Sequence, residues 1–204
     1  MDILSEICNT AAKHPDRTAV TNGSQSCTYE ELWRYSGILA CVLHERIPKG
    51  QPVPVYGHKS PWMPVCFLAC VRSGHPYCPV DTSVPTDRVR RILQLIPAGT
   101  LLMTEDAPHP DPEGGHCLLS LEELRRICGA VETTEPGSGR EEAADAVPDP
   151  SWAVAGGDIF YIIFTSGSTG IPKGVQISAE CLFHFLDWSV GLGVCQKQKG
   201  ALSF

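Results

Sequence analysis

Short β-type segments alternate with amphipathic helical segments along the first 104 residues of the chain. Parallel strands need long crossover connections, so this alternation favours a largely parallel sheet covered by helices on its faces. We therefore predict an α/β fold. The expected helices cover residues 3–11, 28–46, 60–72 and 85–95, and the expected strands cover residues 18–21, 53–56, 77–80 and 100–104.

Local signals predict where several of these elements begin. Asn22-Gly23 is a tight-turn pair and indicates a hairpin. Thr28-x-x-Glu31 and Ser120-x-x-Glu123 are capping boxes, which predict the first turns of two helices. Ser60-Pro61 predicts a third helix start, with Ser60 as the N-cap and proline at the first helical position.

The charge pattern excludes several classes of function. The net charge is −7, and residues 132–149 hold six acidic residues against Arg140, a local balance of −5. Lys and Arg form no cluster of the kind that binds nucleic acid. No apolar run approaches the roughly 20 residues that span a bilayer, so we expect no membrane insertion. Acidic residues stand where a secretory signal has basic ones, which predicts a cytoplasmic location.

Cysteine and histidine spacing predicts no metal site. The cysteines show no CxxC pair, and Cys66 and Cys70 fall on the apolar stripe of a helix, so we expect reduced core thiols. His109 and His116 lie in a Pro- and Gly-rich loop at residues 105–117, where we expect them to be solvated. The ten cysteines are Cys8, Cys27, Cys41, Cys66, Cys70, Cys78, Cys117, Cys128, Cys181 and Cys195.

The apolar run Ile159–Phe164 ends abruptly in the sequence TSGSTGIPKG at residues 165–174. Glycines let a backbone turn tightly and bring its N–H groups close to an anion, and hydroxyl groups and Lys173 add donors and positive charge. The extended pattern of Val175-Gln176-Ile177 predicts a loop between two strands. A Walker A loop leads into a helix and has Ser or Thr after its lysine, so a kinase or GTPase loop is disfavoured.

The stretch YIIFTSGSTGIPKGV resembles the phosphate-loop signature of the adenylate-forming, or AMP-binding, superfamily. Two further segments resemble motifs of that family in the expected order: Thr28–Leu32, similar to TYxEL, and Arg72–Asp81, similar to KAGxxYxPxD. The resemblance implies that ATP phosphates, with Mg²⁺ carried by the nucleotide, are held by the loop. The residues concerned are Thr165, Ser166, Gly167, Ser168, Thr169, Gly170 and Lys173.

Finer details resemble the D-alanine-activating branch of the superfamily. They are VYGHKSP at residues 55–61, His75-Pro76 within the second motif, and PKGVQIS at residues 172–178. The resemblance implies that D-alanine or another small carboxylic acid is joined to ATP, and that the acyl group then passes to the phosphopantetheine thiol of a carrier protein. In that branch the product serves D-alanylation of teichoic acids in cell walls.

The resemblance also implies that residues 1–204 are an incomplete AMP-binding domain, the N-terminal portion of the large domain without the small C-terminal domain. The family's substrate-binding aspartate, adenine and ribose contacts and catalytic lysine follow the phosphate loop, so no catalytic residue is assigned and the chain is expected to be inactive alone. Asp187 is expected to be structural. Two alternatives remain: a truncated, non-catalytic nucleotide-binding product, and part of an acyl-CoA synthetase or peptide-synthetase domain.

Residues 130–150 are rich in Glu, Asp, Ala, Gly and Pro, and we predict an acidic, solvated insertion there. Such a segment buries little apolar surface. Deleting residues 133–146 should therefore change the melting temperature little, as measured by circular dichroism. A large drop would show that the segment packs against the domain.

Overall fold

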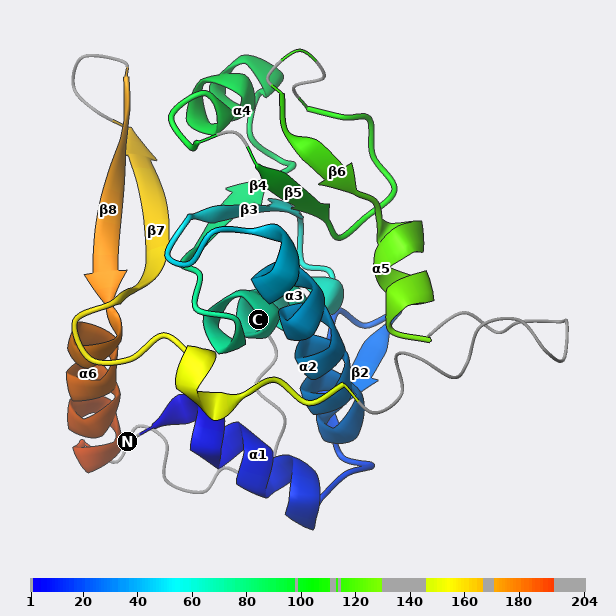
Figure 1. The fold of residues 1–204 in the computed structure, drawn as a ribbon, viewed down its shortest axis with the longest axis vertical. Coiled ribbons are helices and arrows are strands. Elements are labelled where there is room, and N and C mark those ends of the chain that lie inside the picture. Colours follow the sequence, from blue (N-terminus) through cyan, green and yellow to red (C-terminus); the bar gives the residue numbers. More distant parts are fainter. Residues whose placement is uncertain are drawn as a thin grey trace, which may run out of the picture.

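The computed structural model describes residues 2–97, 99–110, 113, 115–129, 146–166 and 171–192 (Figure 1). In this part of the chain the main sheet has six strands in the order β6-β5-β3-β4-β7-β8. All neighbouring pairs are parallel except β7 and β8. The fold is therefore α/β, as predicted. The strands are β3 (Val53–Gly57), β4 (Tyr77–Asp81), β5 (Thr100–Met103), β6 (Cys117–Leu119), β7 (Ile159–Ser166) and β8 (Pro172–Ser178).

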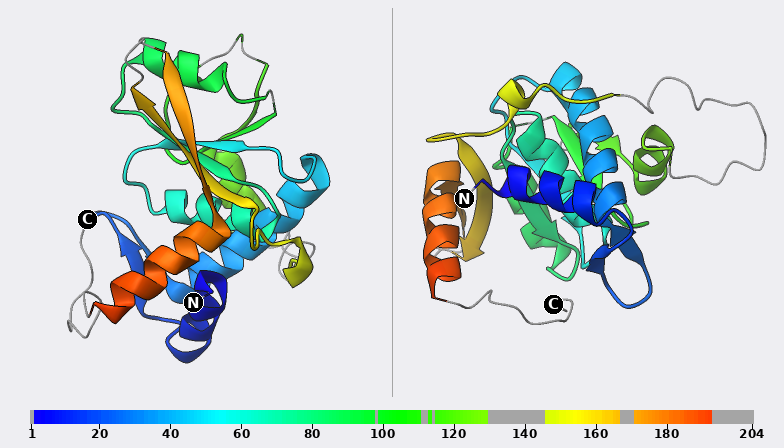
Figure 2. Two further views of the ribbon diagram at one scale, coloured as in Figure 1. Left: turned by 90° about the vertical axis from the view of Figure 1, so that its left-hand side faces the viewer. Right: turned by 90° about the horizontal axis from the view of Figure 1, so that it is seen from below.

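Helices cover both faces of the main sheet. In Figure 1, α4 lies above the sheet, whereas α2 and α3 lie below it. Figure 2 shows α6 beside the β7–β8 hairpin, at one side of the main body. The helices are α1 (Ile3–Lys13), α2 (Tyr29–Arg46), α3 (Trp62–Arg72), α4 (Thr86–Leu93), α5 (Leu121–Ile127) and α6 (Ala179–Gly191), with a short 3₁₀ turn η1 (Pro150–Trp152). None of the helices in the described ranges is both long and apolar enough to cross a bilayer.

The alternation of side chains along the strands divides the core into two layers. Val53 and Val55 of β3 face the layer that contains α2 and α3, together with Phe160 of β7. Cys78 and Val80 of β4 face the layer that contains α4. Strands buried on both faces in this way are typical of parallel sheets.

The capping boxes form as predicted. Thr28 Oγ1 accepts a hydrogen bond from the Glu31 amide at 3.2 Å, and Glu31 Oε2 accepts one from the Thr28 amide at 2.8 Å. Ser120 and Glu123 make the same exchange at the start of α5. The Asn22-Gly23 pair turns β1 (Thr18–Thr21) into β2 (Ser26–Thr28), which pair antiparallel, with a φ of +92° at Gly23.

Four details differ from the sequence-based expectations. Helix α3 begins at Trp62, although Ser60 Oγ still accepts a hydrogen bond from the Trp62 amide at 3.2 Å. Strand β6 was not expected; it pairs with β5 and begins at Cys117. His116, just before this strand, is buried rather than solvated. Finally, the apolar run at residues 159–164 contributes to both core layers but is not buried throughout, since Ile163 is 45 % exposed.

The cysteine prediction is confirmed for Cys66 and Cys70, which are buried in the core. Burial raises the pKa of both thiols and keeps them protonated. The described part of the chain contains no group of three or more His, Cys, Asp or Glu side chains that could hold a metal ion. Of the acidic segment at residues 130–150, residues 130–145 lie outside the described ranges.

Arg72 of α3 contacts α2 through hydrogen bonds and a cation–π interaction. Its Nη1 donates hydrogen bonds to the carbonyl of Trp33 and to Ser36 Oγ, and its guanidinium carbon lies 3.6 Å from the centre of the Trp33 ring. Burial lowers the pKa of Arg72 to about 10, so the side chain stays charged at neutral pH. Gly37 lets α2 approach this group, because a Cβ there would lie 3.1 Å from Arg72 Nη2.

Gly57, at the end of β3, is required by a close contact with the end of β5. A Cβ at this position would lie 1.9 Å from Thr104 Oγ1, which itself donates to the Tyr56 carbonyl at 3.2 Å. Gly57→Ala should lower the free energy of unfolding by about 1–3 kcal/mol, as measured by urea denaturation. The comparison is Gly157→Ala, where a Cβ meets nothing within 4 Å and the change should stay within about 0.5 kcal/mol.

Thr104→Ala in the Gly57→Ala background removes the clashing oxygen. The double variant should be more stable than the sum of the two single changes predicts, because each single change acts on the same contact. Strict additivity would contradict the proposed clash.

Candidate functional site

The β7–β8 hairpin positions the predicted phosphate loop. Thr165 lies opposite Lys173 in the antiparallel register, and Ser166 lies opposite Pro172. The loop thus joins two strands, as the sequence predicted. Thr165 Oγ1 donates to the Lys173 carbonyl at 3.4 Å, and the Lys173 side chain is exposed. The predicted residues Gly167, Ser168, Thr169 and Gly170 lie outside the described residues.

Gly174 leaves room for two side chains of the neighbouring strand β7. A Cβ there would lie 3.0 Å from Ile162 Cγ2 and 3.3 Å from Phe164 Cε1, so the two side chains cover bare backbone. Ile162 and Phe164 pack in the layer that contains α4, and this layer includes Val89. Packing therefore holds Ile162 and Phe164, which lie just before Thr165, the residue opposite Lys173.

The carboxyl end of β7, where the predicted loop begins, lies at the edge of the sheet where functional residues of α/β proteins gather. Because β3, β4, β5 and β7 are parallel, their carboxyl ends point to the same edge. The connection from β3 runs through α3 on one face, and that from β4 runs through α4 on the other. When the connections that follow two adjacent strands lie on opposite faces of the sheet, a crevice forms between the carboxyl ends of those strands. Open α/β sheets bind ligands in such a crevice.

A His–Asp pair occupies this edge between β3 and β4. His58 Nδ1 and Asp81 Oδ1 are 2.9 Å apart. A carboxylate only accepts, so Nδ1 carries the proton of this hydrogen bond. The His58 amide also donates to Glu105 Oε2 at 3.1 Å, which brings the ends of β3, β4 and β5 together. The next residue, Lys59, has a φ of +52°, a left-handed conformation that is uncommon for residues other than glycine.

No contiguous pattern in the sequence points to this pair. Both residues were part of segments that resemble family motifs, but they are 23 positions apart and only strand pairing brings them together. Partial burial raises the pKa of the Asp81 carboxyl, but hydrogen bonds from Ser83 and His58 outweigh it and hold the pKa below its usual range. Asp81 therefore remains an anion beside His58 at neutral pH.

The chain matches the model of the AMP-binding enzyme family over residues 8–200. It belongs to this family. The sequence resemblance to the AMP-binding superfamily is thereby confirmed.

Curated relatives within the family are ligases. The chain is 42 % identical over 191 residues to the D-alanine–D-alanyl carrier protein ligase of Bacillus licheniformis, which covers 92 % of this chain and 34 % of that protein. It is 38 % identical over 196 residues to the ligase of the same name from Bacillus cereus, covering 93 % and 35 %. The chain thus spans about one third of the length of these relatives.

Solved structures of other proteins share the fold. The N-terminal subdomain of Klebsiella oxytoca NpsA, in complex with 3-hydroxybenzoyl-AMSN, is 27 % identical with a TM-score of 0.63, covering 87 % of this chain and 41 % of that one. The nonribosomal peptide synthetase FmoA3 in its AMPPNP-bound form has a TM-score of 0.72 at 23 % identity, covering 94 % and 18 %. The second likeness concerns the fold alone.

The hydrogen-bonded Asp81 predicts a pH-dependent contribution to stability. A carboxyl group whose pKa is lower in the folded state stabilises fully above its unfolded pKa of about 3.9, and loses this effect as the pH falls through the folded pKa. The difference in unfolding free energy between the natural chain and Asp81→Asn should therefore be constant above about pH 5 and shrink below about pH 4. Urea denaturation across this range measures it.

Asp106→Asn is the matched control, because Asp106 is exposed and makes no hydrogen bond or ion pair with any other described residue. Its stability difference should be small, because the change removes no described contact. An Asp81→Asn difference that grows on acidification would contradict the pairing.

Proposed function

We propose that this chain supplies the ATP-phosphate-binding part of a ligase that activates D-alanine and transfers it to a D-alanyl carrier protein. Thr165, Ser166, Gly167, Ser168, Thr169, Gly170 and Lys173 would hold the phosphates of ATP. The observation that carries the proposal is the hairpin: it places Thr165 opposite Lys173 at the carboxyl edge of the parallel sheet. The 42 % identity to a D-alanine–D-alanyl carrier protein ligase supports the choice of substrates.

The proposed reaction has two steps. A carboxylate oxygen of D-alanine attacks the α-phosphorus of ATP, and the bond from this phosphorus to the bridging oxygen breaks, so that pyrophosphate leaves with the bonding electrons. The phosphopantetheine thiol of the carrier protein then loses its proton and attacks the acyl carbon, and AMP leaves. Negative charge grows on pyrophosphate only in the first step. A cation and hydroxyl donors aimed at that group accelerate this step.

Mg²⁺ fits this proposal as an ion that arrives with the nucleotide. The described residues form no cage of three or more metal-binding side chains. Mg²⁺ often keeps several waters and uses substrate phosphates as ligands, so a dedicated cage is not required. When bound, the ion would neutralise phosphate charge, while Lys173 would bind and orient the phosphates.

Lys173→Ala should slow formation of the aminoacyl-adenylate about tenfold to a thousandfold, equivalent to about 1.4–4 kcal/mol of transition-state stabilisation. Transfer from preformed alanyl-adenylate should change much less, because pyrophosphate has already left. Thr165→Ala removes a neutral donor and should cost less than the lysine change. Single-turnover kinetics of each half-reaction measures these effects in a chimaera that joins this chain to the remaining part of the Bacillus licheniformis ligase.

Lys13→Ala is the matched control, since Lys13 is an exposed lysine in the last turn of α1. It should leave both half-reactions unchanged. Unimpaired adenylation in Lys173→Ala would remove the loop from the mechanism, and equal losses in both half-reactions would indicate a folding defect instead.

A further inference from the structure

A pocket lies away from the phosphate loop. It has a volume of about 360 Å³ and is formed by the β1–β2 hairpin, α2, the first turn of α3, and α5. We call it the Trp62 pocket. Figure 1 shows α5 on the opposite side of the molecule from the β7–β8 hairpin, so this pocket and the predicted nucleotide site are separate.

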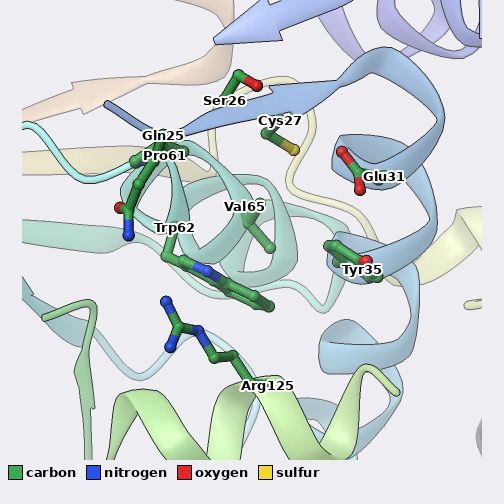
Figure 3. Close-up of a pocket in the computed structure, with 9 residues that line it drawn as sticks. All are labelled: Gln25, Ser26, Cys27, Glu31, Tyr35, Pro61, Trp62, Val65 and Arg125. Atoms are coloured by element: carbon green, nitrogen blue, oxygen red, sulfur yellow. The ribbon is translucent and has the colours of Figure 1, made fainter. Parts of the chain in front are cut away.

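Aromatic surface runs through the middle of the Trp62 pocket. The Trp62 and Tyr35 rings are stacked, with centroids 5.4 Å apart and planes inclined by 10°. Figure 3 shows the Trp62 indole crossing the pocket, with Val65 on one side and Arg125 on the other. Both rings are half-buried. Flat, half-buried rings of this kind favour a planar ligand, because offset stacking adds to the burial of apolar area.

Polar groups gather at one end of the indole. Arg125 reaches in from α5 and Gln25 from the β1–β2 hairpin, and their side chains end beside the Trp62 ring (Figure 3). Within the described ranges, neither side chain makes a hydrogen bond or ion pair with another residue. An arginine fork with open donors matches a carboxylate, which it can bind through two parallel hydrogen bonds.

The acidic residue of the pocket does not compete for Arg125. Glu31 Oε2 accepts the capping hydrogen bond from the Thr28 amide at 2.8 Å. Figure 3 places its carboxylate near Tyr35 and Cys27, at the other end of the pocket from Gln25. Burial, followed by the charge of Glu31, raises the pKa of Cys27 to about 12, so the thiol is neutral. The positive charge of Arg125 therefore lies at the Gln25 end of the Trp62 pocket, away from the carboxylate of Glu31.

From this arrangement we propose that the Trp62 pocket binds a small planar molecule that carries a carboxylate. The ring lies against the Trp62 indole, the carboxylate accepts hydrogen bonds from Arg125, and the Gln25 amide donates a further one. A cavity of this size lies within the range of small-molecule sites. The proposal goes beyond the ligase function and does not depend on it, since no residue of the phosphate loop takes part.

The probe is indole-3-carboxylate, titrated into the 204-residue chain and followed by protein-observed NMR at the tryptophan indole N–H signals. The Trp62 signal is assigned by its loss in Trp62→Phe. We expect saturable binding with a Kd of about 1 mM or tighter, with the largest shift at Trp62. Indole-3-carboxamide has the same shape without the charge and should bind at least about tenfold more weakly.

One variant and its matched control decide the outcome. Arg125→Gln should weaken binding of the carboxylate at least about tenfold and leave binding of the carboxamide unchanged. Arg126→Gln, one position along α5 and exposed, should change neither. Arg125 makes no hydrogen bond or ion pair with the described residues, so its replacement should leave the melting temperature unchanged.

The opposite results would overturn the proposal. These are equal binding of carboxylate and carboxamide, equal losses in the Arg125 and Arg126 variants, or no saturation up to about 10 mM. Equal competition by inorganic phosphate would also overturn it, because an anion site without ring recognition needs no contact with Trp62.

Discussion

The parallel pairing of β3 with β4 is the constraint on which the rest of the structure depends. Parallel strands cannot be joined by a tight turn, so α3 must cross one face of the sheet to return the chain to β4. The return through α4 covers the other face. Both strands are then buried on both sides, and their carboxyl ends meet at one edge. Gly57 permits the close approach of β5 there, and His58 and Asp81 come within hydrogen-bonding distance.

Local signals in the sequence were sufficient for much of this fold. The capping boxes at Thr28 and Ser120 and the turn at Asn22-Gly23 act within a few residues, so they are readable without tertiary information. Strand β6 was missed because it is only three residues long and depends on pairing with β5. The same pairing buries His116, whose loop composition had suggested exposure.

The candidate sites also differ in whether the sequence alone could reveal them. The hairpin that positions Thr165 and Lys173 was predictable, since an apolar run, a glycine-rich loop and a second extended run follow each other along the chain. The His58–Asp81 pair depends on strand register, and the Trp62 pocket depends on how four separate elements pack. Neither arrangement leaves a contiguous pattern. Side chains such as Arg125 therefore look like ordinary charges on a helix until the packing is known.

The start of α3 has a consequence for communication within the domain. His58 lies at the carboxyl edge of the sheet, and Trp62, four positions later, lies in the pocket on the α5 side. A ligand that shifts the first turn of α3 would also shift the backbone that holds His58. Thermodynamic linkage then requires reciprocity: whatever factor such a ligand applies to nucleotide affinity, the nucleotide applies to the affinity of that ligand. The element that such linkage would use is the short connection at residues 58–61, between β3 and α3.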